Sequence, residues 1–290
     1  MTIKEKGYSH WDGELTTKKR PWKPIARNGI KLTLKKKFFK LTYALALVPS
    51  IVFLVGIYLA ERIDDFSIMT EEGVPQFIKV NPALFKTYLT NEFLLFMIII
   101  IVVFSGAGLI ADDLKFNSLQ LYFSRPLGKQ DYLLGKASVL VFFLLFLTLV
   151  PGIILFIMKL IFSGSLKFIG DFPLLPLSII GYSILVTVFF SLYTLLLSSI
   201  SKNKRYVIIL MVGIYFFSDV LFAIFYGIFR KSIFSLLSLK VNLQQLGAAF
   251  FGVKAPHNVP WIYSLFIIIA ICCLSGFVLF RKIKSVEIVK

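Results

Sequence analysis

The chain has 290 residues and a mass of 33.0 kDa; 58% of its residues are hydrophobic, 16% are charged, and its mean hydropathy is +0.84. These values exclude an ordinary soluble domain and indicate a membrane protein. The net charge of +17 belongs beside water and anionic lipid headgroups in so apolar a chain, which argues against a nucleic-acid partner.

The N-terminal 37 residues are polar and basic, and no short apolar stretch with a small-residue cleavage site occurs among them. No cleavable signal peptide is therefore predicted, and the first apolar run is expected to insert as a true span. Ile30, Leu34 and Phe38 recur at every fourth position among lysines, which predicts a helix lying in the membrane interface. A simple basic membrane anchor is a compatible interpretation.

Six apolar runs are long enough to cross a hydrocarbon core of ~30 Å, which needs ~20 helical residues. They cover residues 38–60, 91–111, 133–161, 173–200, 206–226 and 260–280. The fold class predicted is therefore an all-α membrane protein with six transmembrane helices. The fifth run is interrupted by Asp219 and continues into an amphipathic stretch, 222–251, which is too polar for a clean span.

The distribution of positive charge predicts the orientation of these spans. Most of the 32 Lys and Arg residues fall in segments 1–40, 112–136, 201–205 and 281–290, which alternate with segments poorer in them. The positive-inside rule then places both termini in the cytoplasm. The acidic run between Glu61 and Glu72 falls on the outer side, where we interpret it as a solvated loop.

The inventory of catalytic residues is short. His10 and His257 are the only histidines, so no histidine-based metal cluster or Ser-His pair is predicted. The adjacent Cys272 and Cys273 lie in an apolar run and provide neither a disulfide framework nor a thiolate zinc site. No GxxxxGK[ST] phosphate loop occurs, so ATP-driven work must come from a partner. We predict no catalytic residue, no metal and no cofactor bound by this chain.

Two acidic residues need separate interpretation. Asp219 is the one acid well inside an apolar run, and such a residue favours a proton or cation site. The competing interpretation is that the helix ends at Asp219, which then sits near the outer interface or caps a re-entrant turn. Glu92, at the start of the second span, is interpreted as compensating the helix dipole rather than as a substrate contact.

The most informative segment, 106–136, joins spans two and three on the cytoplasmic side. Asp112 and Asp113 can end the membrane helix and begin a surface helix whose positive end favours carboxylates. Pro126 breaks that helix, and Asp131 restarts the chain into the third span. Apolar residues recur near helical spacing at Leu114, Leu119, Tyr122 and Phe123. The pattern predicts a rigid, mostly apolar knuckle on which a motor subunit can push.

This pattern of acidic residues, a hydrophobic helix, Ser-Arg-Pro-Leu and then Asp-Tyr-Leu-Leu-Gly-Lys resembles the permease subunits of type-2 ABC transporters. In that family the loop between spans two and three contains the coupling helix that docks in the ATP-binding subunit, which implies the same for 112–129. The family often has Gly-Thr where this chain has Asn117-Ser118. The coupling residues implied by the resemblance are Asp112, Asp113, Phe116, Leu119, Leu121, Tyr122, Ser124, Arg125 and Pro126.

The resemblance extends to both sides of this segment. Tyr8, Trp11 and Gly13, followed by 24–27, look like the cytoplasmic leader of a subset of these permeases, and the interfacial helix after them would be the family's elbow helix. The implied division is an arm with the elbow helix, 1–37, and a six-span permease domain, 38–290.

Before the sixth span, the resemblance implies re-entrant or interfacial helices that form an outer gate within 222–259. Such backbone breaks at membrane depth are tolerated only where protein covers them or where they line a cavity. Replacing Asn242, Gln244 and Gln245 by alanine would test a gating role.

By function, the resemblance implies the transmembrane subunit of an ATP-driven exporter, without an ATPase site of its own. It would form the translocation pathway with a second permease chain, identical or related, over ATP-binding subunits that hold ATP and Mg. The expected location is the inner (plasma) membrane of a bacterium, in contact with membrane lipid. Two alternatives stay open: a non-transporting scaffold or assembly factor, and an ion-coupled carrier using Asp219, for which further intramembrane acids would be expected.

Overall fold

The computed structural model describes residues 20–61, 80–123, 127–165 and 167–286. Over these residues the regular elements are helices, and six of them are long and apolar enough to cross a membrane, as predicted. The six spans are Lys37–Glu61, Pro82–Lys115, Lys129–Ser163, Leu175–Ile200, Lys204–Phe229 and Trp261–Lys282. The all-α fold class is thereby confirmed.

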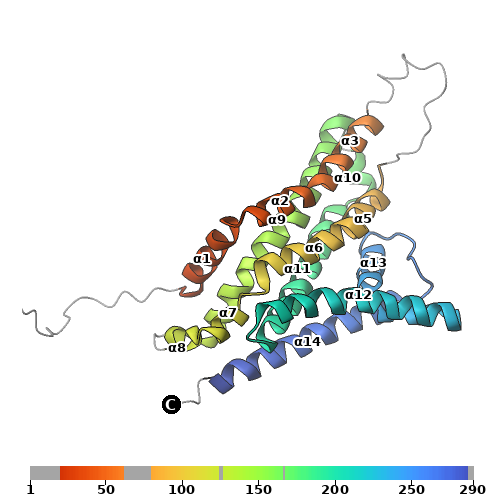
Figure 1. Cartoon of the computed structure of the whole chain (residues 1–290). Coiled ribbons are helices and arrows are strands. Elements are labelled where there is room, and N and C mark those ends of the chain that lie inside the picture. The colour runs from red at the N-terminus through yellow and green to blue at the C-terminus, as the bar shows by residue number, and fades with distance from the viewer. Residues whose placement is uncertain (1–19, 62–79, 124–126, 166, 287–290) are drawn as a thin grey trace, which may run out of the picture.

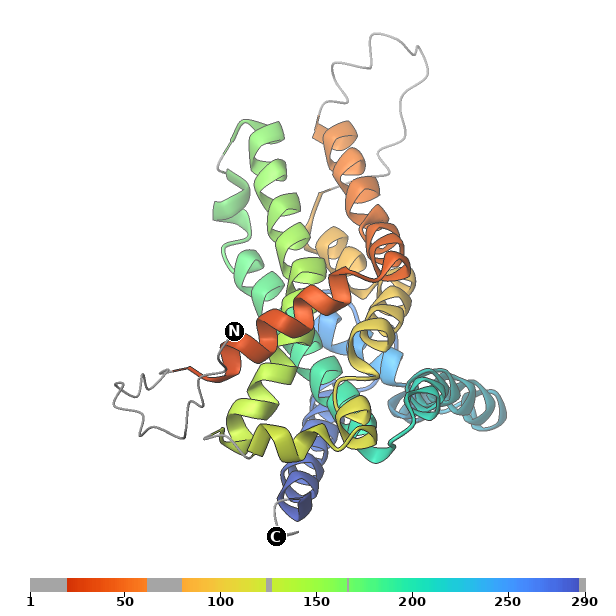
Figure 2. The same cartoon turned by 60° about the vertical axis from the view of Figure 1, so that its left-hand side comes forward.

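The first helix, α1 (Trp22–Leu34), precedes the spans and packs along α9 (Lys129–Ser163), as Figures 1 and 2 show. Its small residues Ala26 and Gly29 lie on the packed side, where Gly29 closely approaches Val139. The helix ends at Leu34, so Phe38 of the predicted apolar stripe belongs to the next helix, where it is exposed. That α1 lies in the membrane interface as an elbow helix stays a prediction.

The first span consists of α2 (Lys37–Ala46) and α3 (Val48–Glu61), which meet at a turn at Leu47. Where α3 ends, the Glu61 carboxylate forms a buried ion pair with Lys159 of α9, with 2.5 Å between Oε1 and Nζ. This pair fastens the far end of the first span to the third. Residues 62–79, which follow, lie outside the described residues.

The second span starts earlier than the sequence predicted. Residues 82–90, which precede the predicted span 91–111, form the helix α5 (Pro82–Thr90) ahead of α6 (Glu92–Gly106). The Asn81 side chain accepts a hydrogen bond from the Leu84 N–H, and Pro82 occupies the first turn, which is a favourable helix start. Asn91 is not helical and separates the two helices.

The core of the molecule is formed by the second, third and fourth spans. In their most apolar windows, 67%, 50% and 61% of residues are buried, against 11%, 17% and 22% in the first, fifth and sixth spans. The third span, α9, has 35 residues, which corresponds to ~52 Å of helix. It packs against α11 (Leu175–Ile200), which is linked to it by the short α10 (Lys167–Asp171).

The fifth span, α12 (Lys204–Phe229), continues for ten residues beyond Asp219, so the interpretation that the helix ends there is wrong. The 3₁₀ helix η2 (Ser232–Leu237) and α13 (Leu239–Phe250) follow before α14 (Trp261–Val286). Helices before the last span were predicted, and α13 packs against α5, α11 and α14. In Figure 1, α12 and α14 diverge from α3 and α9, with α13 on the side of α5.

One end of the bundle carries α1, α7 (Ala111–Lys115), α8 (Ser118–Phe123) and the turn between α11 and α12 (Figure 1). The C-terminal residues of α14 lie at the same end. We call it the basic end. The end at which α3 and α9 terminate is called the opposite end.

Candidate functional site

Near its end, the second span has a junction between α6 and α7 that α11 holds in place. The buried Ser198 Oγ accepts hydrogen bonds from the N–H groups of Ile110 (3.0 Å) and Ala111 (3.1 Å) and donates one to the Ala107 carbonyl (2.9 Å). The first N–H groups of a helix lack partners within it, so one serine of α11 satisfies the start of α7. The position of α7 is therefore fixed by the fourth span.

A buried cluster joins α7 and α8 to the start of α9. The Asp113 carboxylate lies 2.7 Å from Lys136 Nζ and accepts a 2.7 Å hydrogen bond from the Tyr132 hydroxyl. The Lys136 ammonium lies over the rings of Tyr122 and Tyr132, at 5.6 and 5.5 Å from their centroids. The side chains of Lys136 and Asp113 are only 10% and 14% exposed, so the charges neutralise each other away from water.

The turn between α7 and α8 depends on Asn117, which has a positive φ of 52°. Asparagine adopts this left-handed region more readily than other residues with a Cβ. Asn117 is therefore a residue type that suits this turn. Burial, and next the negative charge of Asp113, raise the pKa of Tyr122 in α8, which keeps this phenol neutral at physiological pH.

We call residues 111–123 the coupling element. Its outward surface is formed by exposed Lys115, Phe116 and Gln120, and 68% of Phe116 is accessible. Lys115 Nζ lies 5.2 Å from the Phe116 ring centroid. A large apolar side chain is therefore presented on a helix pair whose inner side is clamped to the bundle.

The predicted coupling residues differ in exposure. Asp113 and Tyr122 belong to the buried cluster, Leu119 is buried within the chain, and Asp112 is half-buried. Phe116 alone among the described ones is freely exposed. The side chain of Leu121, and Ser124, Arg125 and Pro126 entirely, lie outside the described residues, as do Tyr8, Trp11 and Gly13 of the leader.

Sequence reasoning missed Ser198, Tyr132 and Lys136 as parts of this site. The spacing of Tyr132 and Lys136, four residues apart in the first turns of a span, puts both on one helix face. This spacing, together with Asp112 and Asp113 shortly before it in the chain, was the available signal for a contact between the two segments. Lys136 was counted as a positive charge near the membrane and as the last residue of the Asp-Tyr-Leu-Leu-Gly-Lys motif, and neither observation indicated its pairing with Asp113.

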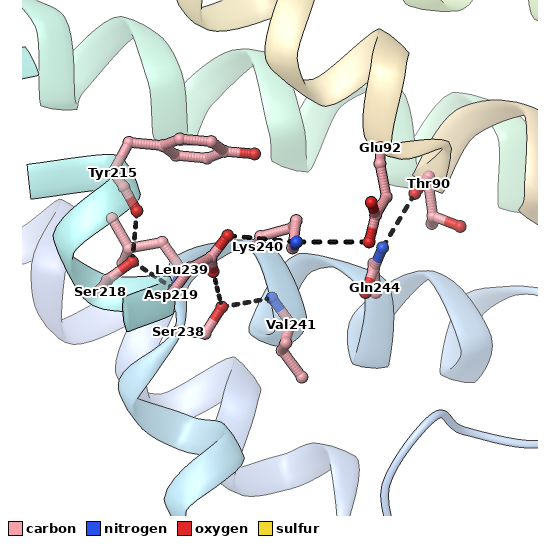
Figure 3. A network of polar contacts seen from close by, with 10 residues as sticks. All are labelled: Thr90, Glu92, Tyr215, Ser218, Asp219, Ser238, Leu239, Lys240, Val241 and Gln244. Carbon is pink, nitrogen blue, oxygen red and sulfur yellow. Dashed lines mark hydrogen bonds and ion pairs between the residues drawn. The ribbon is translucent and has the colours of Figure 1, made fainter. Parts of the chain in front are cut away.

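A second polar cluster lies far from the basic end, between α6, α12 and α13 (Figure 3). Lys240 Nζ is 3.1 Å from Asp219 Oδ2 and 3.3 Å from Glu92 Oε1. We call these three residues the charge cluster. Asp219 lies ~22 Å along α12 from Lys204, and Glu92 lies ~21 Å along α6 from Gly106, so both acids are at a similar depth.

Asp219 also anchors the start of α13. Its carboxylate accepts a hydrogen bond from Ser238 Oγ, and the neighbouring Ser218 Oγ accepts one of 3.2 Å from the Leu239 N–H. Ser238 caps α13 by accepting from the Val241 N–H (3.0 Å). The intramembrane acid predicted from the sequence thus holds a helix start, and α12 and α13 form one unit at this point.

The three amides named for the outer gate hold α13 to its surroundings. Gln244 Nε2 donates to the Thr90 carbonyl at 3.3 Å, and Gln245 Nε2 donates to the His257 carbonyl at 3.2 Å. Asn242 Nδ2 donates to two carbonyls of the preceding segment, both at 2.8 Å. Alanine at these positions would therefore loosen α13 whether or not it gates a pathway.

Metal ligation finds no support in the part of the chain that the structure describes, where no group of three His, Cys, Asp or Glu residues could hold an ion. His257 instead packs edge-on against Phe222, with 5.2 Å between ring centroids. Cys272 and Cys273 are free thiols.

A protein-family model described as "ABC-2 family transporter protein" matches residues 25–283. The match begins within α1 and includes all six spans, the coupling element and the charge cluster. Among curated proteins, none matches the chain.

Proposed function

This chain belongs to the ABC-2 transporter family, and from that membership we propose that it is the membrane-spanning subunit of an ATP-driven exporter. The family consists of membrane transport components that associate with an ATP-binding subunit. In this proposal ATP and Mg bind to the separate partner, and this chain contributes the translocation pathway. The family match over residues 25–283 is the observation that carries it.

The coupling element supports the proposal by its geometry. Docking on a motor requires an exposed contact surface, and Phe116, Lys115 and Gln120 supply one. Transmission requires that this surface be rigidly joined to the spans, and the Asp113–Lys136 pair and the Ser198 hydrogen bonds join it to α9 and α11. A push on Phe116 would then move the third and fourth spans together.

A second permease chain belongs to the proposal because the first and fifth spans are poorly covered by this chain. Only 11% and 17% of their most apolar windows are buried, so lipid or another protein must cover the rest. Two permease chains over two ATP-binding subunits would form the transporter. The proposal puts both termini in the cytoplasm of a bacterial inner-membrane protein, which the Lys and Arg residues at the basic end support through the positive-inside rule.

The proposal is tested by purifying a tagged full chain from its native host in mild detergent and identifying the subunits that accompany it. We expect an ATP-binding subunit, and we expect a Phe116→Asp variant to lose it while reaching the same amount in the membrane. The matched control is Phe172→Asp, which alters an exposed phenylalanine between α10 and α11 near the opposite end. A chain that arrives without an ATP-binding subunit would contradict the proposal and favour a membrane scaffold.

A further inference from the structure

The charge cluster carries one negative charge that its own residues do not compensate. Two carboxylates, Glu92 and Asp219, share the single ammonium group of Lys240. Among the described residues, no other cation forms an ion pair with either acid. The start of α6 offers Glu92 only the partial positive charge of a helix N-terminus.

The two acids hold Lys240 unequally. Asp219 is only 22% exposed, pairs with Lys240 at 3.1 Å and is fixed further by Ser238. Glu92 is 73% exposed and its contact with Lys240 is longer, at 3.3 Å. Lys240 can therefore release Glu92 and keep a neutral pair with Asp219, which leaves the exposed carboxylate free to receive another cation.

Aromatic side chains adjoin the exposed acid. Phe96 lies one turn after Glu92 on α6, Phe216 lies one turn before Asp219 on α12, and their ring centroids are 6.0 Å apart. Both rings are partly exposed, at 36% and 43%. Aromatic faces beside a carboxylate attract cations that carry an apolar body, because the ring and the acid recognise different parts of the ligand.

A buried hydroxyl points toward the same place. Tyr215 is only 2% exposed, and within the described residues its hydroxyl has no hydrogen-bond partner. Figure 3 shows this hydroxyl directed toward the side on which Lys240 and Glu92 lie. Buried hydroxyl groups normally have partners, so an unpartnered one beside two acids and an ammonium is left with a hydrogen bond that a ligand drawn to Glu92 could supply.

The depth of Glu92 decides whether its exposed carboxylate can face lipid or must face water. An ionised carboxylate that faces lipid at membrane depth is costly, whereas one that faces a water-filled path is not. We propose that Glu92, with Phe96, Phe216 and Tyr215, forms a site on the translocation pathway for an organic cation with an apolar body. When no ligand is bound, the Lys240 ammonium pairs with Glu92. This inference rests on the proposed function and names its substrate class.

The test uses the full chain in lipid nanodiscs without any ATP-binding subunit, and the lipophilic cation rhodamine 6G as the probe. Binding is measured by fluorescence anisotropy. We expect Glu92→Gln, which leaves the Lys240–Asp219 pair intact, to weaken binding at least tenfold. Lys240→Met, which removes the competing ammonium, should strengthen binding several-fold. The matched control, Asp171→Asn, removes an exposed carboxylate from α10 and should change the dissociation constant less than twofold.

An unchanged dissociation constant in Glu92→Gln would overturn the inference, and so would an equal loss in Asp171→Asn, because general attraction to negative charge would then explain binding. Should Lys240→Met fail to fold, Glu92→Gln decides alone. Since the assay uses this chain by itself, it is independent of the purification of partners. Absence of an ATP-binding subunit would contradict the proposed function and leave the binding result standing.

Discussion

The Asp113–Lys136 pair makes a quantitative prediction about how firmly the coupling element is attached. In a Lys136→Met variant, Asp113 would keep the hydrogen bond from Tyr132 but lose its countercharge. Removing one partner of a buried ion pair costs about 3–5 kcal/mol. Because the Tyr132 hydroxyl still donates, we expect the lower value, about 3 kcal/mol, for the free energy of opening α7 and α8.

Hydrogen exchange measured by mass spectrometry on the full chain in nanodiscs reports this opening directly. A loss of about 3 kcal/mol corresponds to roughly 100-fold faster exchange of the α7 and α8 amides, since 1.4 kcal/mol is a factor of ten. Amides in the middle of α11 should not change. The matched control is Lys115→Met, the same replacement at an exposed lysine of α7, for which less than threefold change is expected.

A double variant isolates the interaction itself. With Asp113→Asn added to Lys136→Met, no unpaired charge is left in the cluster, so the combined effect should be clearly smaller than the sum of the two single effects. Strict additivity, or a Lys136→Met variant that exchanges no faster than the Lys115→Met control, would refute the reasoning that this pair clamps the coupling element.

The remaining predictions concern stability measured by thermal unfolding in detergent. Asn117→Gly relieves a positive φ and should raise the free energy of unfolding by about 0.5–1 kcal/mol, so a lower melting temperature would contradict the assigned turn. Ser198→Ala leaves two buried N–H groups of α7 without their acceptor and should cost about 1–3 kcal/mol; no loss would show that they find another partner. Gly247→Val would collide with the Thr90 side chain and cost about 1–3 kcal/mol. The control is Gly213→Ala, where space is open and a change of about 1 kcal/mol or less is expected, toward stability; equal losses in both would refute the close α13–α5 contact.

The spans could be predicted from the sequence because a bilayer imposes length and composition on each of them independently. Span ends were less predictable, since local capping decides them. Residues 82–90 were left out of the second span, which was predicted to begin at residue 91. The Asn81-Pro82 start signal was present, and the structure shows that it begins a helix.

The candidate site was only partly predictable for a different physical reason. The coupling element is local in sequence, so acidic, apolar and breaking residues marked it. The contacts that hold it and those of the charge cluster join distant residues, such as Ser198 with Ile110 or Lys240 with Glu92. Such pairings depend on how the helices pack, which periodicity does not encode. Glu92 does lie in the first turn of α6, as dipole compensation requires, but its contact with Lys240 was not predicted.

The two buried lysines of α9 constrain how this protein can evolve. Lys136 and Lys159 lie ~35 Å apart on one continuous helix, and each is paired with an acid from a different span, Asp113 or Glu61. Inserting or deleting one residue between them would rotate one lysine relative to the other by ~100° and shift it by ~1.5 Å. One of the two pairs would then be broken inside the protein. Selection should therefore act against insertions and deletions between Lys136 and Lys159. Length differences among homologues should occur elsewhere in the chain.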